Sequence, residues 1–181
     1  RNESSAASDV YKRQMKFLNT FLLGISVTIL DTLYKGRHFE RFWVLEEIAR
    51  APYFAFISVL HLRESLGLRG QVHTDLMKEH FAQTLNETEH LEEMEKRGGN
   101  KYWIDRFFAR HLVLLYYWIN VAYYLFDPID AYDLSEKIEW HAADTYSKYL
   151  EEFPHDEKIS AIMQDEIHHA QELSEAIRLI T

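Results

Sequence analysis

The sequence predicts an all-α protein, on the basis of hydrophobic periodicity, the absence of strand patterns and the placement of its glycines and prolines. From Met15 onward, apolar residues recur at the three- and four-residue spacing of helices that bury one face. No segment shows the strict apolar–polar alternation typical of half-buried strands. The chain contains 6 Gly and 3 Pro, and most of them fall between the periodic segments.

The first two helices are expected at 16–34 and 40–65. The first is apolar over about fourteen residues, which is short for a bilayer span, and it has no signal-peptide cleavage site. The second keeps apolar residues at i, i+3, i+4 and i+7 and tolerates Pro52 within the pattern. Gly67 and Gly70 mark its end.

Four more amphipathic segments complete the expected bundle of six helices. Gly98 and Gly99 end the first of them, Pro128 follows the strongly aromatic second, and Pro154 ends the third. The expected helices are 71–97, 101–126, 131–152 and 156–179.

Length and composition restrict the functions open to this chain. Its 181 residues suit a single domain, which we assign to residues 15–181. Residues 1–14, "RNESSAASDVYKRQ", are polar and aperiodic and look like translated adapter sequence, so we expect a non-native or disordered tail there. The net charge of −9 argues against nucleic acid as a partner. With no Cys, any metal must be bound through nitrogen and oxygen.

Two Glu-x-x-His pairs lie inside long helical patterns, namely Glu87 with His90 and Glu166 with His169. Residues i and i+3 of a helix share one face, about 5–6 Å apart at Cβ, so both side chains of a pair can reach one cation. A third occurrence, at 152–155, contains a proline and cannot lie on a regular helix. About one such pair is expected by chance.

Two further glutamates lie on predicted inward faces. Glu46 shares a stripe with Phe42 and Tyr53, and Glu139 shares one with Tyr132. Lone buried glutamates are unfavourable unless they are paired or bind metal. One Glu from each of two helices plus one Glu-x-x-His from each of two others is the ligand set of a carboxylate-bridged di-iron or di-manganese site in a four-helix bundle.

The sequence therefore predicts a ferritin-like four-helix bundle with a di-iron carboxylate core and additional membrane-surface helices. The alternatives are four solvent-exposed glutamates in i,i+4 pairs, or a structural zinc site, for which Cys or His ligands would dominate. The expected metal ligands are Glu46, Glu87, His90, Glu139, Glu166 and His169.

Five stretches resemble the plastid terminal oxidases, the plastoquinol-oxidising branch of the alternative oxidases. They are "RFWVLEEIARAPYFAFISVLHL", "HFAQTLNETEHLEEMEKRGGN", "DRFFARHLVLLYYW", "HAADTYSKYL" and "DEIHHA". The resemblance extends from about Ile29 to Ala176. It implies a membrane-surface quinol:oxygen oxidoreductase that reduces O₂ to water at two non-haem iron ions without pumping protons, using plastoquinol or ubiquinol.

The resemblance also implies roles for residues around the ligands. Asn86 and Asp165 would lie behind the ligands and tune the metals, and Arg41 and Thr145 would lie near the quinol head group. The chain departs from the family in its first motif, Leu-Glu-Thr, where Glu47 replaces the threonine. The hydrogen bond of that threonine is therefore not expected here.

Tyr146 follows Glu139 by seven residues, two turns along the same helical face, so a phenol is expected near the metals. As a candidate catalytic residue, it could supply an electron for cleavage of the O–O bond. Equally, it could be a buried tyrosine that hydrogen-bonds to a ligand.

Two apolar helices suggest contact with one membrane leaflet. Residues 111–126 and 16–34 are apolar with Tyr and Trp suited to the headgroup level, and Arg106 and Arg110 lie at one end. Alternatively, these helices pack on each other or across a dimer interface. We expect a monotopic homodimer at a thylakoid or cytoplasmic membrane. The short connection 151–157 favours a cyanobacterium or a phage-infected host.

Three other functions share parts of this pattern. A soluble ferritin-like iron oxidase or storage protein has the same ligand set but no need for the two apolar helices. A di-iron hydroxylase of quinone biosynthesis also lies on membranes and would yield a hydroxylated ring. A metal-free helical interaction module would contain no iron.

Overall fold

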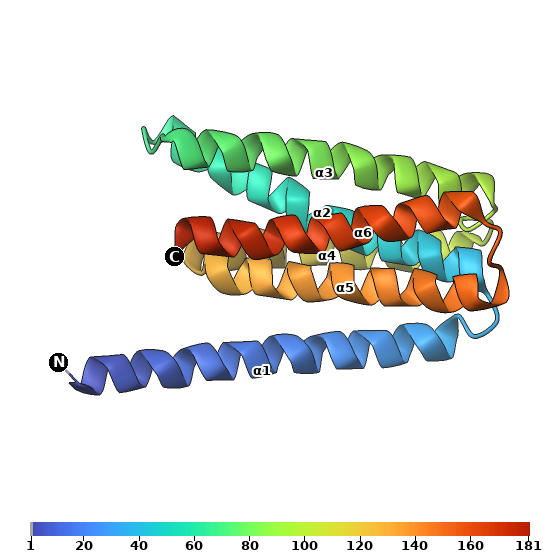
Figure 1. Cartoon of the computed structure of the whole chain (residues 1–181), viewed down its shortest axis with the longest axis horizontal. Helices are drawn as coiled ribbons and strands as arrows, with labels where there is room; N and C mark the ends of the chain where they lie inside the picture. Colours follow the sequence, from blue (N-terminus) through green and yellow to red (C-terminus); the bar gives the residue numbers. More distant parts are fainter. Residues whose placement is uncertain (1) are drawn as a thin grey trace.

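The computed structural model describes residues 2–181, with side chains described from Gln14 onward. All regular secondary structure of residues 2–181 is helical. Figure 1 shows the helices, most of them running along a common axis. In chain order they are α1 (Asn2–Leu33), α2 (His38–Ser65), α3 (Gln71–Lys96), α4 (Trp103–Phe126), α5 (Pro128–Glu152) and α6 (Glu157–Ile180). The predicted all-α bundle is confirmed. Helix α1 includes residues 2–14 and so begins well before the expected start at residue 16. The assignment of residues 1–14 as a non-native or disordered tail stays a prediction.

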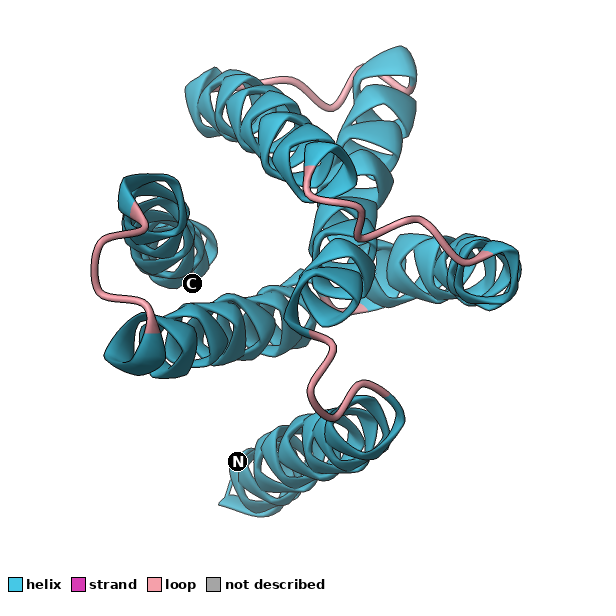
Figure 2. Ribbon diagram, turned by 90° about the vertical axis from the view of Figure 1, so that its right-hand side faces the viewer, coloured by secondary structure: helices cyan, strands magenta, loops and turns pink. Residues whose placement is uncertain are grey.

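Helices α2, α3, α5 and α6 form the central bundle. Helix α2 packs on α3, α5 packs on α6, and contacts of α2 with α5 and of α3 with α6 close the bundle. Helix α4 packs on α2 and α5, and α1 packs on α5 from outside. Figure 1 shows α1 along the edge of the molecule, and the end-on view in Figure 2 shows the helix that carries the N-terminus set apart from the others. The four central helices are those that carry the predicted ligands.

Two apolar layers fill the bundle, one on each side of the predicted ligands. One layer is centred on Phe42, Trp43 and Ile159, and the other on Phe56 and Leu173. Each ligand glutamate falls between residues of the two layers on its own helix. The acidic residues thus lie in the middle of the core, where burial is most costly for a charge.

A directional chain of hydrogen bonds crosses the second apolar layer. The side chain of Gln83 donates to Glu172 (2.9 Å) and accepts from Nδ1 of His80 (2.7 Å). Nε2 of His80 then accepts from the hydroxyl of Tyr132 (2.7 Å), which in turn contacts that of Tyr124 (2.5 Å). Burial lowers the pKa of His80 to about 4, so the ring is neutral and can donate and accept at once. This chain joins α3, α4, α5 and α6.

Helix α5 begins three residues before its predicted start. Pro128 occupies the first turn, where no backbone N–H is needed, and the Asp127 side chain accepts from the N–H of Asp130 (3.2 Å). The Asp-Pro pair therefore both ends α4 and begins α5.

The expectation that the first apolar helix is too short to cross a membrane is wrong on length. Residues Gln14–Leu33 form 20 continuous helical residues with mean hydropathy 1.3, so by length and composition alone this helix could cross a membrane. Only 6% of its apolar window is buried inside the protein. Small and polar residues such as Gly24 interrupt the apolar run in the sequence without interrupting the helix.

We expect Gly99→Ala to destabilise the junction of α3 with α2. A Cβ at this position would lie 2.4 Å from the carbonyl oxygen of Phe39 and 2.7 Å from Cβ of Trp43, so backbone must move. Overpacking of this kind typically costs about 1–3 kcal/mol. Chemical denaturation measures the loss. Gly24→Ala is the control, because a Cβ there meets nothing within 4 Å, and equal losses in both variants would contradict the prediction.

Candidate metal centre

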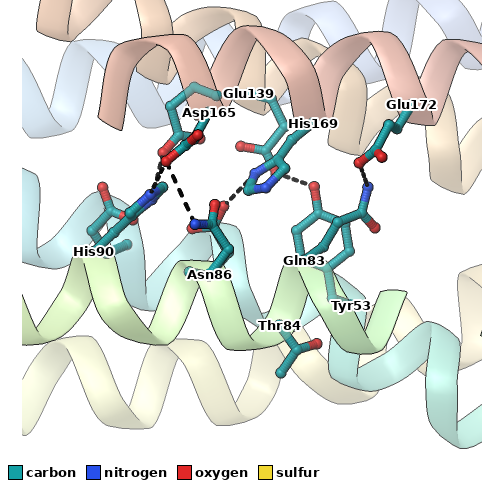
Figure 3. A network of polar contacts seen from close by, with 12 residues as sticks. Tyr53, Gln83, Thr84, Asn86, His90, Glu139, Asp165, His169 and Glu172 are labelled. Atoms are coloured by element: carbon teal, nitrogen blue, oxygen red, sulfur yellow. Dashed lines mark hydrogen bonds and ion pairs between the residues drawn. The ribbon is translucent and has the colours of Figure 1, made fainter. Parts of the chain in front are cut away.

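The six predicted metal ligands come together from four helices in the middle of the bundle. Glu46 belongs to α2 and Glu139 to α5, while α3 and α6 each contribute a Glu-x-x-His pair. None of the six is more than 4% exposed, so the alternative of solvent-exposed glutamates is wrong. Figure 3 shows His90, Glu139 and His169 converging from different helices.

The ligands form two groups that share two residues. In each group, one donor atom per residue lies within 4.8 Å of the donors of the others. The first group is Glu46, Glu87, His90 and Glu166, and the second is Glu87, Glu139, Glu166 and His169. Each group could hold one cation, and Glu87 and Glu166 would bridge the two. Four carboxylates match the charge of two divalent cations.

Several donor atoms of these groups are buried and have no hydrogen-bond partner. Both carboxylate oxygens of Glu87 and Glu166 are unpartnered, and so is one oxygen each of Glu46 and Glu139. Nδ1 of His169 lies 2.7 Å from Oε1 of Glu87, and Nδ1 of His90 lies 3.1 Å from Oε1 of Glu166, both without hydrogen-bond geometry. Such unpartnered buried groups are unfavourable unless a cation binds them, so the residues present fit a two-metal centre.

The electrostatics of the metal-free cluster are unfavourable. Burial raises the pKa of Glu46 and of Glu166 to about 8. Burial, and then the charges of Glu87 and Glu166, raises the pKa of Glu139 well above its ordinary value. Burial alone would lower the pKa of His90, but the carboxylates of Glu166 and Glu46 outweigh it and raise that pKa to about 12. Without metal, the cluster therefore retains protons that a cation would displace.

A carboxylate behind the cluster orients one histidine. Nε2 of His90 lies 3.1 Å from Oδ2 of Asp165, which also accepts from the side chain of Asn86 at 3.5 Å. This contact turns Nδ1 of His90 toward the glutamates, as expected for a metal-binding histidine. Figure 3 shows both interactions. Asn86 and Asp165 are in contact behind His90, each one residue before a glutamate common to both ligand groups.

Each non-bridging glutamate accepts a hydrogen bond from a tyrosine. The hydroxyl of Tyr146 donates to Oε1 of Glu46, and that of Tyr53 donates to Oε1 of Glu139 (2.7 Å). Tyr146 thus lies at the cluster, but it contacts the glutamate of α2 and not the one on its own helix. Sequence reasoning gave no role to Tyr53, although it follows Glu46 by the same seven residues that separate Tyr146 from Glu139.

With this geometry established, comparisons place the chain among known proteins. The family model described as "Alternative oxidase" matches residues 6–172. The chain belongs to the alternative oxidase family. It is similar to ubiquinol oxidase 4, chloroplastic/chromoplastic, of Arabidopsis thaliana, with 49% identity over 133 residues. These residues are 74% of this chain and 37% of that relative, so the chain spans well under half of it. No solved structure matches the chain.

The side chains of Arg41 and Thr145 lie side by side. The resemblance to alternative oxidases implies that both lie near the quinol head group. Nη2 of Arg41 is 3.4 Å from the hydroxyl of Thr145, and the same guanidinium pairs with Asp31 of α1 (2.6 Å). Nε of Arg41 is buried without a partner. These side chains form a polar spot where α1, α2 and α5 meet, one residue from Tyr146.

Glu47, which replaces the threonine of the alternative oxidase motif, takes no part in the cluster. It is 6% exposed and pairs with Arg50 at 3.0 Å. Both residues line a pocket of about 410 Å³ between α2 and α4. The substitution therefore removes the threonine hydroxyl without adding another carboxylate to the cluster.

Proposed function

We propose that this protein is a quinol:oxygen oxidoreductase with two iron ions, of the plastoquinol terminal oxidase type. The observation that supports this most is the pair of ligand groups that share Glu87 and Glu166. A redox reaction that delivers four electrons to O₂ suits two adjacent redox metals, and family membership supports a quinol as the reductant. The overall reaction consumes one O₂ and two quinols and yields two waters and two quinones without pumping protons.

The two ions would lie at opposite ends of the cluster, one in each ligand group. Glu46 and His90 would hold one ion and Glu139 and His169 the other, with Glu87 and Glu166 between them. When bound, the irons supply the redox chemistry that reduces O₂. The chain contributes a dry site with matched charge, and the contact of His90 Nε2 with Asp165 leaves Nδ1 of that histidine for the metal.

We propose that the quinol head group binds at Arg41 and Thr145. The unpartnered Nε of Arg41 and the hydroxyl of Thr145 provide a donor and an acceptor for a quinol hydroxyl. Tyr146 is adjacent to Thr145 in sequence and its hydroxyl contacts Glu46, so it lies between this spot and the cluster. A proton or electron that leaves the quinol would pass this phenol, which is the role proposed for Tyr146.

Oxygen uptake by iron-loaded membranes, with added quinol, tests the proposed function. We expect Glu166→Ala to abolish uptake, because it removes a ligand that both ions share. Glu175→Ala is the matched control, since Glu175 lies on the same helix and is exposed. Uptake that persists in Glu166→Ala would contradict the proposal. Product analysis excludes a ring hydroxylase if quinone is the product, and an iron mineral in place of quinone would indicate a ferritin-like protein.

The exposed faces of α1 and α4 support binding to a membrane surface. Both helices expose large apolar side chains, which are unfavourable in water over so wide an area. On α1 they are Phe17, Leu18, Phe21, Leu22, Ile25, Ile29 and Leu33. On α4 they are Trp103, Ile104, Phe107, Phe108, Leu112, Leu114, Leu115, Trp118, Ile119, Leu125 and Phe126.

The packing of α1 favours a position within one leaflet over a membrane crossing. Asn19 of α1 donates to the carbonyl of Asp130 (3.0 Å) and to Asp133 (2.9 Å) of α5, and Leu30 is buried in the first apolar layer. Helix α1 is thus held along the bundle, and a crossing would draw the Asp133–Lys137 ion pair of α5 into hydrocarbon. A monotopic protein at a thylakoid or cytoplasmic membrane is our proposal. The cyanobacterial or phage-infected host and the homodimer remain predictions.

Pelleting with liposomes tests the membrane surface. We expect the wild-type protein to co-sediment with the liposomes. The double variant Leu115→Asp, Trp118→Asp should remain largely in the supernatant, because binding would place each new carboxylate in the hydrocarbon region of the bilayer. Leu85→Asp is the control, since Leu85 is exposed on α3. Equal binding of both variants would contradict the assignment of α4 to the membrane.

A further inference from the structure

The oxygens of the four glutamates are not equivalent in their hydrogen bonding. Glu87 and Glu166 have both carboxylate oxygens unpartnered. Glu46 and Glu139 each have Oε2 unpartnered, while Oε1 accepts from a tyrosine. The chain therefore leaves two oxygens for metals on each bridging glutamate and one on each non-bridging glutamate.

The two tyrosines are arranged as a crossed pair. Tyr53 lies two turns after Glu46 on α2 and binds Glu139 of α5, whereas Tyr146 lies two turns after Glu139 and binds Glu46. Both tyrosines are 0% exposed. Each end of the cluster thus has one histidine, one non-bridging glutamate and one tyrosine.

We propose that Tyr53 and Tyr146 keep the non-bridging glutamates bound to metal through a single oxygen, Oε2, which leaves an additional coordination position open on each ion. The inference rests on the proposed di-iron function and concerns the positioning of ligands. The Tyr53 hydroxyl donates to Oε1 of Glu139 and competes with a cation for that oxygen, so it disfavours chelation by Glu139 through both oxygens. Tyr53 is the new assignment, as a positioning residue for the ion of Glu139 and His169.

Neighbouring rings hold the Tyr53 hydroxyl in place. The Tyr53 ring lies 6.0 Å from the rings of His169 and His80 and 6.2 Å from that of Phe56, centroid to centroid. His80 itself is fixed at both nitrogens by Gln83 and Tyr132. These contacts limit movement of the Tyr53 ring, so removal of the hydroxyl is the direct way to free Oε1 of Glu139.

The proposal determines how many coordination positions on each ion are filled by protein atoms. With the non-bridging glutamate bound through one oxygen, the four residues of a ligand group could each supply one atom to an ion. Iron sites that activate O₂ keep positions free of protein ligands for the substrate. A glutamate that chelated through both oxygens would fill one of these positions, so each tyrosine would preserve access for O₂ to one ion.

Azide binding and Mössbauer spectroscopy of the iron-loaded protein test the proposal. In Tyr53→Phe, we expect two irons still to bind, one of the two iron signals to change, and azide affinity to fall about tenfold or more as Glu139 closes the position. In Tyr146→Phe, we expect the other iron signal to change. Tyr149→Phe is the control, because the hydroxyl of this buried tyrosine donates to Asp156 and contacts no ligand of the cluster.

The outcomes separate this inference from the proposed function. Two bound irons with unchanged signals and azide affinity in Tyr53→Phe would overturn the inference and leave the oxidase proposal intact. The same signal change in Tyr149→Phe would also overturn it, because the effect would then follow from loss of any buried tyrosine hydroxyl. Failure of the wild-type protein to bind two irons would overturn the proposed function itself.

Discussion

Removal of the metals should make the stability of this protein fall steeply as the pH rises from 6.5 to 8. In the metal-free fold, Glu46 and Glu166 have pKa values of about 8, whereas an unfolded glutamate titrates near its ordinary value. The folded state therefore binds more protons than the unfolded state between about pH 4.5 and 8. The free energy of unfolding must decrease with pH across that window.

The size of this effect follows from linkage. Each such group changes the free energy of unfolding by up to about 1.4 kcal/mol per pH unit, so Glu46 and Glu166 together give roughly 3 kcal/mol between pH 6.5 and 8. His90, with a pKa of about 12 in the fold, acts in the same direction above pH 6.5. Domains of this kind are stable by about 5–15 kcal/mol. His80 contributes in the opposite direction, because its pKa of about 4 makes stability rise with pH, but only below about pH 6.5.

Bound cations should reverse this dependence. They replace the protons on the glutamates and stabilise the charged carboxylates, so metal affinity increases with pH. Denaturant unfolding of chelator-treated and iron-loaded protein at pH 6.5 and pH 8 measures the difference. Glu166→Gln is the control, because a neutral isostere removes one of the titrating carboxyls and should weaken the pH dependence of the metal-free protein. Metal-free stability that is constant or rises over this range would contradict the prediction.

The ligand residues could be predicted from sequence because helices have a fixed period. A glutamate within an apolar stripe becomes buried when that stripe packs against other helices. Two pairs, Glu87 with His90 and Glu166 with His169, each share one helical face whatever the tertiary structure. The structure adds that Glu87 and Glu166 are common to both groups, which depends on how four helices meet. Sequence spacing along one helix contains no such information.

The partners across helices could not be predicted, for the same reason. The spacing of Tyr146 from Glu139 indicated a phenol at the cluster, but its partner is Glu46 on α2. The relative axial positions of α2 and α5 decide which glutamate each tyrosine meets, and contacts between helices set them. The bonds from His80 to Gln83 and Tyr132 were likewise missed, since His80 is one polar residue on a mixed face.

The two adjacent histidines of α6 provide the sharpest test of the site. We expect His169→Ala to lose the ion of the second ligand group and to reduce oxygen uptake by more than about a hundredfold, because loss even of partners behind metal ligands costs about 10–100-fold. His168→Ala should retain both irons and most activity. The side chain of His168 is 67% exposed and pairs with Glu172, whereas that of His169 is 5% exposed.

The comparison is well matched because both variants remove the same side chain from neighbouring positions of one helix. Successive residues point about 100° apart, so one ring faces the cluster and the other faces solvent. Iron content per chain separates the two, with a fall in His169→Ala only. If His169→Ala kept both irons, or if His168→Ala lost them equally, then the second ligand group would not be a metal site, and the bridging positions assigned to Glu87 and Glu166 would have no second ion to join.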